Sequence, residues 1–587
     1  MSADIVTPDQ PDTALADDSP AVPPGREDAE IVAKTGSSLL DRLLNEQQEL
    51  TAVERFAQQH DHGGLPAQAK YYSHLIPATA PMQGQQYAFD VDLDRCSGCK
   101  ACVTACHSLN GLDDSEAWRD VGLLVGGTSQ NPVMQHVTTA CHHCLDPACM
   151  TACPVDAYEK NAVTGIVKHL DDQCFGCQYC TLACPYDVPK YHSRKGIVRK
   201  CDMCSDRLSA GEAPACVQAC PHEAIAISIV ETQQVIEDSE ADVFLPGTPE
   251  PSITLPTTTY RTKRVFPRNL LPVDYYSVAV QHSHWPLIIM LVLTQLSVGA
   301  FLAGMALEAV ISETLSAAIR PLHTLTALVF GLTALGASTL HLGRPQYAFR
   351  AVIGLKHSWL SREIVAFGAF AGVAVLYAAG NWMGPEAVVS SPYWQSWLGW
   401  GVATFGLTGV FCSVMIYAFT QRTFWSFSIT ATKFFLTTGL LGIAAVWLTL
   451  LVLSAGGDPA AAALVLEEGE LICRSLMACA GVKLVYELAV FRHLMKKQST
   501  PLKRSAQLMI GQLASFTMAR FAAGFLGGIV MPAFLLSSVR GNSEPEPVVL
   551  IVVVSMLFLA CLAGELLERT LFFAAVSSAR MPGSLRS

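Results

Sequence analysis

The sequence predicts two unlike parts, a cysteine-rich α+β domain followed by an all-α bundle of eight transmembrane helices. Sixteen of the twenty cysteines lie between Cys96 and Cys220, and apolar stretches recur from about residue 286 onward. A chain of 587 residues is too long for one ordinary domain. Only 15% of its residues are charged and its mean hydropathy is +0.33, which is high for a soluble protein. We therefore expect four regions, covering residues 1–85, 86–230, 231–283 and 284–587.

The cysteines form four runs of four. They are Cys96, Cys99, Cys102 and Cys106; Cys141, Cys144, Cys149 and Cys153; Cys174, Cys177, Cys180 and Cys184; and Cys201, Cys204, Cys216 and Cys220. The first and third runs read C-x2-C-x2-C-x3-C, whereas the second and fourth have a longer middle gap. In this pattern three thiolates hold one cluster and the fourth reaches a neighbouring cluster. Four runs predict four [4Fe–4S] clusters in a tandem ferredoxin-like domain, and electron transfer as the function.

Other uses of the cysteines fit less well. Disulfide frameworks belong to small secreted domains, and nothing in the sequence resembles a signal peptide. A structural zinc site takes four ligands and does not need a fourth cysteine from another run. The other four cysteines lie in apolar segments and are expected to be buried hydrophobic residues; they are Cys412, Cys473, Cys479 and Cys561.

The regions on either side of the cysteine runs differ in composition. Residues 1–35 are acidic and rich in Pro and Ala, which is typical of disorder. Residues 37–59 have the apolar periodicity of one amphipathic helix. This helix could pack on its own domain or hold a partner subunit. Residues 231–283 are rich in Thr and Pro, which predicts a linker with a few short strands.

Eight apolar stretches are long enough for a helix of about 20 residues to cross a bilayer. They lie near 286–308, 319–340, 363–381, 397–419, 433–455, 470–491, 518–538 and 548–572. Nineteen lysines and arginines lie on the side of the cysteine-rich domain, whereas the opposite loops have Arg320, Arg474 and Arg540. The positive-inside rule then places both termini and the clusters in the cytoplasm, beside the inner membrane.

Several ionisable residues lie in the half of the bundle nearest the clusters. We expect His341, Glu565 and Arg569 to act in catalysis, and His341, Arg362 and Glu363 to bind a quinol. Lys483, Glu487 and Arg520 lie in the same half and could instead be structural ion pairs or reach the membrane surface.

His341 is the strongest of these candidates. An imidazole can accept the hydroxyl proton of a quinol as the electrons leave. A haem ligand would need a second histidine at matching depth. His323 lies eighteen residues earlier on the same predicted helix, about 27 Å away along its axis. No haem is therefore expected.

These motifs resemble two subunits of dimethyl sulfoxide reductase-type molybdoenzymes. The cysteine region is similar to the iron–sulfur subunit, with Cys-His-His-Cys-Leu-Asp-Pro-Ala-Cys from Cys141 and Cys-Phe-Gly-Cys-Gln-Tyr-Cys from Cys174. The helical region resembles the membrane anchor, with His-Trp-Pro-Leu at 284–287, His-Leu-Gly-Arg-Pro at 341–345 and Gly-Glu-Leu-Leu-Glu-Arg at 564–569. In the family these are separate chains, whereas here they form a fusion.

The resemblance implies which cysteines share a cluster. The first and fourth runs would share two clusters, held by Cys96, Cys99, Cys102 and Cys220, and by Cys106, Cys201, Cys204 and Cys216. The second and third would share two more, held by Cys141, Cys144, Cys149 and Cys184, and by Cys153, Cys174, Cys177 and Cys180. Because no cysteine of the third run is replaced by Trp, all four clusters are expected to be [4Fe–4S].

The resemblance implies a membrane-bound electron-transfer subunit for anaerobic respiration. Electrons would pass from menaquinol or another quinol to a separate molybdopterin-containing catalytic subunit, with the lipid membrane and the quinone pool as further partners and no role for nucleic acid. The chain itself would carry electrons for an oxidoreductase without being its catalytic subunit. Electron flow from an oxidised substrate to quinone is one alternative, and a membrane redox sensor or assembly scaffold is another.

Overall fold

The computed structural model describes residues 39–62, 68–114, 116–383, 392–540 and 547–583, which fall into two compact units, Met1–Lys70 and Tyr71–Ser587. The segment predicted to be disordered lies outside the described residues. In the first unit the predicted amphipathic helix is divided into α2 (Leu39–Gln48) and α3 (Ala52–His62). The reason is a capping box at Thr51. Its hydroxyl accepts from the Glu54 N–H at 3.2 Å, and its own N–H donates to the Glu54 carboxylate at 2.7 Å.

Two small sheets and two short strand pairs give the cluster domain its α+β fold. Strand β1 (Gln85–Asp92) lies between β8 (Ile225–Glu231), which is antiparallel to it, and β9 (Thr259–Arg261), which is parallel. In the second sheet β2 (Asp120–Gly127) pairs with β3 (Pro132–Thr139) and β10 (Leu271–Pro272). The strand pairs are β4 (Tyr158–Lys160) with β5 (Val167–His169), and β6 (Lys190–His192) with β7 (Ile197–Arg199).

The segment expected to be a linker with a few short strands contributes β9 and β10 to these sheets. It also contains a helix that the sequence analysis did not predict, α9 (Thr232–Glu240). The β1–β8 pairing joins the segment just before the first cysteine run to the segment just after the last one, so the sheet closes the cysteine region.

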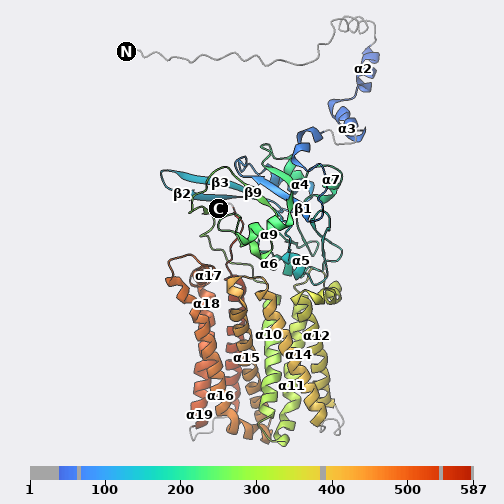
Figure 1. Ribbon diagram of the computed structural model, residues 1–587. Helices are drawn as coiled ribbons and strands as arrows, with labels where there is room; N and C mark the ends of the chain where they lie inside the picture. The colour runs from blue at the N-terminus through green and yellow to red at the C-terminus, as the bar shows by residue number, and fades with distance from the viewer. Residues whose placement is uncertain (1–38, 63–67, 115, 384–391, 541–546, 584–587) are drawn as a thin grey trace, which may run out of the picture. The chain divides into compact units, whose positions relative to one another are not determined.

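Short helices follow the cysteine loops. They are α4 (Ala101–Leu109), α5 (Ala148–Ala152), α6 (Tyr179–Ala183), α7 (Ser205–Ser209) and α8 (Ala215–Gln218). Helix α4 packs on α8, and α5 packs on α6. Figure 1 shows α5 and α6 on the side of the domain that faces the helix bundle, with α4 and α7 farther from it.

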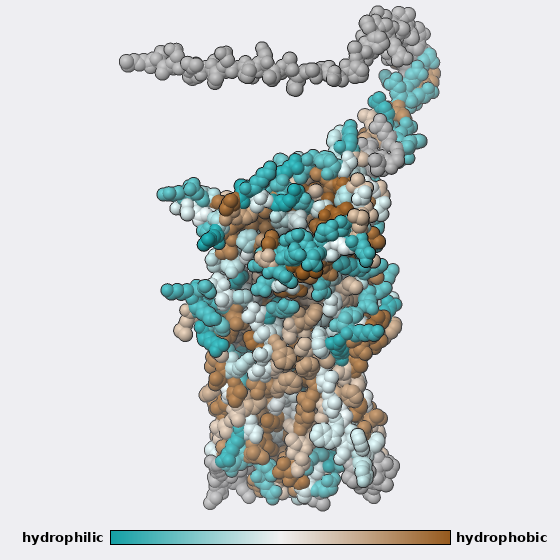
Figure 2. All heavy atoms as spheres, viewed as in Figure 1, coloured by the Kyte–Doolittle hydropathy of each residue, from teal (hydrophilic) through white to brown (hydrophobic). Residues whose placement is uncertain are grey.

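The second half of the chain is a bundle of long helices (Figure 1). They are α10 (Trp285–Glu308), α11 (Glu313–Thr339), α12 (Trp359–Met383), α14 (Pro392–Ala418), α15 (Phe427–Ala455), α16 (Pro459–Leu488), α18 (Ala514–Phe525), α19 (Met531–Arg540) and α20 (Pro547–Ala574). A π-helical turn, Leu526–Val530, joins α18 to α19. Figure 2 shows apolar surface concentrated over the bundle and hydrophilic surface over the cluster domain.

Seven of these helical segments are long and apolar enough to cross a membrane within the described part of the chain, whereas eight were predicted. The eighth is α16, which has 30 residues and therefore ample length. It fails on charge, because it carries three glutamates and Arg474 toward one end and Lys483 and Glu487 toward the other. The last two are buried in the bundle, where both form ion pairs.

The polypeptide after α20 returns to the cluster domain. Gly583 accepts a hydrogen bond from the Leu123 N–H in β2 at 3.2 Å, and its own N–H donates to the Asp274 carboxylate at 3.4 Å. Gly122 faces the Pro582 backbone so closely that a Cβ there would collide with it. The bundle is therefore connected to the cluster domain both by the chain before its first helix and by the chain after its last helix.

Candidate functional site

The structure brings cysteines of different runs close together, and we sort them into the four groups that the family resemblance implies, each drawn from two runs. Their charges interact within each group, and also between groups for Cys102 with Cys216 and for Cys201 with Cys141. We name them group I (Cys96, Cys99, Cys102, Cys220), group II (Cys106, Cys201, Cys204, Cys216), group III (Cys141, Cys144, Cys149, Cys184) and group IV (Cys153, Cys174, Cys177, Cys180). Helix α4 carries members of groups I and II, while α5 and α6 with the residues that follow them carry members of III and IV. Each helix therefore bridges two neighbouring groups.

The sulfurs do not converge on single metal ions, and backbone N–H groups donate to several of them. In the described residues no set of three or more His, Cys, Asp or Glu side chains converges on a single metal ion; the cysteines of a [4Fe–4S] cluster instead surround a larger group. Backbone N–H groups donate to the sulfurs of Cys153 at 3.3 Å, Cys201 at 3.4 Å and Cys220 at 3.2 Å. Such hydrogen bonds stabilise thiolates and tune clusters. These residues fit iron–sulfur clusters.

Lys200 is a buried cation between two groups. It shares a pocket with the four cysteines of group III, and its Nζ lies 3.6 Å from Cys141 Sγ. The ammonium also donates to the carbonyl of Cys201, in group II, at 2.8 Å. Burial lowers the pKa of Lys200, but the thiolate charges of Cys141, Cys149 and Cys201 outweigh it and raise that pKa above its usual value.

Arg119 has the same role between groups I and II. Its Nη1 donates to the Thr138 hydroxyl at 3.0 Å, and that hydroxyl lies 3.6 Å from Cys102 Sγ. Burial lowers the pKa of Arg119, but the thiolates of Cys216 and Cys102 outweigh it and raise that pKa. Among the described residues no carboxylate pairs with Arg119 or Lys200. Sequence reasoning missed both, although Lys200 directly precedes Cys201.

The segment His341–Pro345 docks on group IV. The Gly343 N–H donates to the Gly176 carbonyl at 3.4 Å, and the Arg344 N–H donates to the Phe175 carbonyl at 2.9 Å. Phe175 and Gly176 lie between Cys174 and Cys177. Gly343 also meets Gly196, and a Cβ on any of these three glycines would collide with the facing backbone. Backbone contact of this closeness requires glycine.

Further contacts fix the same interface. The Ser358 hydroxyl donates to the Ala152 carbonyl at 2.7 Å, His357 Nε2 lies 3.0 Å from the Cys153 carbonyl oxygen, and the Tyr179 hydroxyl donates to the Ile416 carbonyl at 3.0 Å. Cys153 belongs to group IV, and Tyr179 lies between two other members of it. Group IV is therefore the group that faces the bundle.

His341 lies just beyond the end of α11 and is half-buried. Burial outweighs a hydrogen bond to the Ser338 backbone and lowers the pKa of His341 to about 4. Burial thus favours the neutral imidazole, which has a nitrogen lone pair that can accept a hydrogen bond or a proton. His323, toward the opposite end of α11, has its Nε2 2.7 Å from the Glu308 carboxylate, which also pairs with Arg320 at 2.9 Å.

Glu363 and Arg362 point in different directions. Glu363 is buried and accepts a hydrogen bond from the Ser413 hydroxyl. Burial and, after it, the charge of Glu363 raise the pKa of Tyr179. Arg362 donates to the carbonyls of Leu355 at 3.1 Å and Lys356 at 2.6 Å. The structure thus places Glu363 near Tyr179 of the group IV loop and His341 two residues before Gly343, which contacts that loop, while Arg362 binds its own preceding loop.

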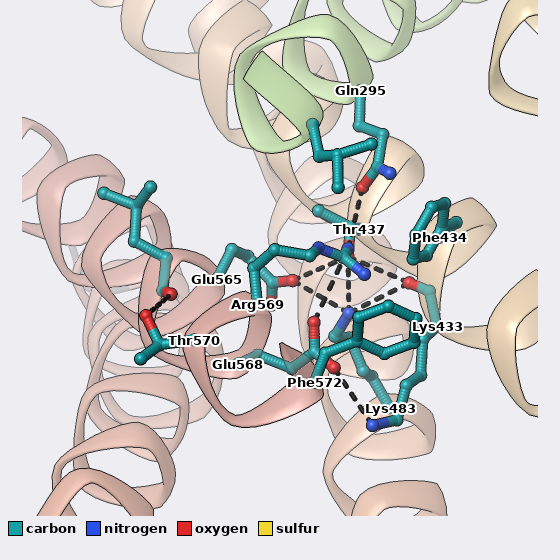
Figure 3. Close-up of polar contacts among 12 residues, drawn as sticks. Gln295, Lys433, Phe434, Thr437, Lys483, Glu565, Glu568, Arg569, Thr570 and Phe572 are labelled. Atoms are coloured by element: carbon teal, nitrogen blue, oxygen red, sulfur yellow. Dashed lines mark hydrogen bonds and ion pairs between the residues drawn. The ribbon is translucent and has the colours of Figure 1, made fainter. Parts of the chain in front are cut away.

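Glu565 and Arg569 belong to a separate, buried ionic network (Figure 3). Glu565 pairs with Lys483 at 2.8 Å and with Arg520 at 3.0 Å, and Arg520 also binds both oxygens of Glu487, at 2.9 and 2.8 Å. The side chains come from α16, α18 and α20.

Two residues that the sequence analysis missed complete the network. Glu568 lies 3.1 Å from Lys433 Nζ, on α15, and 3.5 Å from Arg569 Nη2. Arg569 also donates to Gln295 at 3.0 Å and lies 3.9 Å above the Phe434 ring (Figure 3). Glu568 directly precedes Arg569 in the chain, which was the available signal. We call Lys433, Lys483, Glu487, Arg520, Glu565, Glu568 and Arg569 the ionic network.

Comparison with known proteins covers both halves of the molecule. Residues 132–229 match the 4Fe-4S dicluster domain family, and residues 280–575 match the DMSO reductase anchor subunit (DmsC) family. The B subunit of the anaerobic dimethyl sulfoxide reductase from Haemophilus influenzae is 36% identical over 168 residues, which are 27% of this chain and 82% of that protein. The corresponding B subunit from Escherichia coli K12 is 39% identical over 148 residues, 24% of this chain and 72% of that protein.

A relative from another system shares the cysteine-rich part. The hydrogenase-2 operon protein HybA of Escherichia coli O157:H7 is 33% identical over 189 residues, which are 28% of this chain and 56% of that protein. The predicted resemblance is thus confirmed for both halves. The protein belongs to the DMSO reductase anchor subunit family and is a multi-pass membrane protein that joins this anchor, in one polypeptide, to an iron–sulfur electron-transfer domain of the B-subunit type.

Proposed function

We propose that this chain oxidises menaquinol or another quinol in the membrane and delivers the electrons through four [4Fe–4S] clusters to a molybdopterin-containing catalytic subunit of dimethyl sulfoxide reductase type. The docking of His341–Pro345 on the loop between Cys174 and Cys177 is the observation that supports this most directly. It puts the base that would accept a quinol proton beside the ligands that would hold the first electron acceptor.

We assign one cluster to each of the groups I to IV. When bound, the clusters supply one-electron carriers between group IV, at the bundle, and group I. Groups III and IV share α5 and α6, Lys200 lies between groups III and II, and groups II and I share α4. Cys99 of group I is exposed. This supports an order IV, III, II, I, with the catalytic subunit bound near group I.

His341 and Glu363 are the side chains that we propose for the quinol reaction. The neutral His341 imidazole would take a hydroxyl proton, and the buried Glu363 carboxylate would accept a hydrogen bond from the quinol or take the second proton. Arg362 lies on the same helix turn and would fix the loop that precedes α12. Glu565 and Arg569 would affect the quinol reaction indirectly, through the ionic network to which they belong.

The proposed location is the inner membrane, with the clusters on the cytoplasmic side. The loop charges support it, although Lys433, Arg520 and Arg569, which belong to the count of nineteen, lie within helices. A reporter that is active only in the periplasm should be inactive when fused after Ser587 and active in the loop at Asp458. The reverse pattern would contradict the orientation.

The quinol site is tested by His341→Ala. Loss of the base should lower quinol-dependent turnover of membranes by about 10²- to 10⁴-fold. Turnover with a soluble dye as electron donor should persist, because the dye does not need the quinol site. Ser338→Ala, one turn earlier on α11, is the matched control. Equal quinol turnover in the variant and the parent would remove His341 from this role, and loss of both activities would assign it a structural one.

A further inference from the structure

A second pocket lies at the cluster-side end of the bundle, between α15, α16, α20 and the short helix α17 (Pro501–Ile510). Phe424, Lys433, Glu487, His493, Glu568 and Leu571 are among the residues that line it. We propose that this pocket binds the head group of a quinone or quinol, as a second site distinct from that of His341. The proposal rests on the proposed function, since it takes the chain to react with quinones.

The pocket presents a hydrogen-bond donor and an acceptor side by side. Lys433 Nζ lies 3.1 Å from Glu568 Oε1, and its other neighbours are the faces of Phe424 at 4.9 Å and Phe572 at 5.7 Å. Both carboxylate oxygens of Glu568 are buried, and their ion pairs with Lys433 and Arg569 lack hydrogen-bond geometry, so the carboxylate can still accept a hydrogen bond. A quinone carbonyl could therefore accept from Lys433, and a quinol hydroxyl could donate to Glu568. A ligand oxygen that can play both parts matches this pair.

The rest of the pocket suits an aromatic ring with an apolar tail. Its walls include Phe424, Ile429, Leu502, Met509 and Leu571. A lipid phosphate would also find cations here, but it would stand beside the carboxylates of Glu568 and Glu487, and like charges at short range repel. The polar groups inside the pocket thus favour a neutral head group over an anionic one.

The ionic network holds these groups in place. Arg569 lies beside Glu568 Oε2, whereas Lys433 lies beside Oε1, and Arg520 binds Glu487 through two hydrogen bonds. Arg569 and Arg520 are not among the residues that line the pocket, so they act as positioning residues without contact with a ligand. Positioning of the pocket residues would explain why the bundle contains charges that cost free energy to bury.

The pocket also lies near the cysteine groups. Phe424 belongs to the turn Thr423–Trp425, and the preceding Arg422 donates to the Leu182 carbonyl in α6 at 3.1 Å. Leu182 lies between Cys180 of group IV and Cys184 of group III. Trp425 stacks on Phe572 with ring centroids 5.5 Å apart. A head group in the pocket would thus be joined to α6 through packed aromatic side chains.

The test is photolabelling of the full-length protein in lipid nanodiscs with an azido-quinone, followed by peptide mapping. We expect two labelled regions, one around His341 and Glu363 and one within residues 486–493 or 568–571. Labelling around His341 alone would overturn the second site and leave the proposed function standing. No labelling in either region would contradict the quinone reaction itself, and with it both proposals.

Ala489→Phe should fill the pocket and reduce its labelling by about tenfold, the effect of a loss of about 1.4 kcal/mol in binding, with labelling around His341 unchanged. Val485→Phe, one turn earlier on the exposed face of α16, is the control and should label like the parent. A larger residue at a packed site can disturb the fold of the variant. A second measurement therefore uses the parent protein, in which an excess of unlabelled quinone should displace the label. The proposal would be overturned by persistent labelling of Ala489→Phe or by failure of unlabelled quinone to compete. It would also be overturned if Ala489→Phe lost a bound phospholipid and not the quinone.

Discussion

The cluster domain and the helix bundle both bury cations, but they neutralise them differently. In the bundle Lys433, Lys483 and Arg520 pair with glutamates at 2.8 to 3.1 Å. In the cluster domain Arg119 and Lys200 have sulfurs as their nearest anionic groups and no carboxylate partner among the described residues. A buried cation without a counter-charge is costly. The bundle therefore carries its own charge balance, whereas the cluster domain depends on anionic thiolate-bound clusters for its balance.

Iron removal should produce the largest effect, and only in the cluster domain. The intact protein should contain about sixteen irons per chain, four for each of four clusters. Extraction of the iron should unfold residues 86–283, because the buried cations and thiols lose the group that binds them together. Limited proteolysis should then cut this region while the bundle stays protected. A cluster domain that resists protease without iron would contradict the comparison.

Within the bundle, the greatest loss should follow removal of one charge. Glu565→Gln leaves Glu487 as the single carboxylate shared by Lys483 and Arg520 among the described residues and should destabilise the bundle by about 3–5 kcal/mol. Thermal unfolding in detergent would measure it. Glu470→Gln, which breaks a partly exposed ion pair with Arg474 on α16, should cost about 0–1 kcal/mol. The double variant Glu565→Gln with Lys483→Gln should regain part of the loss. Equal effects of Glu565→Gln and Glu470→Gln would mean that the network is not strongly coupled.

The smallest effect is a shift in cluster potential. Arg119→Met removes a positive charge next to groups I and II, which should favour the more oxidised, less negative clusters and lower their reduction potentials. Redox titration followed by EPR would detect the shift. Arg119→Lys keeps the charge and should retain most of the potential. Unchanged midpoints in Arg119→Met, with the iron content intact, would show that Arg119 serves only to pack against Phe89, whose ring lies 4.5 Å away.

The sequence predicted the parts of the fold that depend on spacing and hydropathy. Cysteine intervals predicted four cluster motifs, and apolar length predicted the helices. Length did not show that α16 carries more charge than the other membrane-spanning candidates, and partners on other helices satisfy some of these charges. The sequence could not tell which of the neighbours Arg362 and Glu363 is buried. Consecutive helix residues point about 100° apart, and packing decides which face of the helix is buried.

Contacts between distant segments were also out of reach. The pair Lys433–Glu568 joins two helices far apart in the chain, and β9 lies parallel to β1 across the whole cysteine region. Neither contact leaves a local pattern in the sequence, because each depends on residues that only the folded chain brings together. The pairing of cysteine runs followed from family resemblance, and spacing alone would have left it open.

The return of residues 580–583 to β2 changes how the two halves associate. In a complex of separate subunits the cluster domain must find its anchor at the concentration of free subunits. Here a covalent tether raises the effective concentration of each half to the millimolar range. The non-covalent attachment of the segment after α20 means that opening the Gly176–Gly343 contact need not release the domain. The fusion thus secures equal amounts of the two components and keeps their contact from being transient.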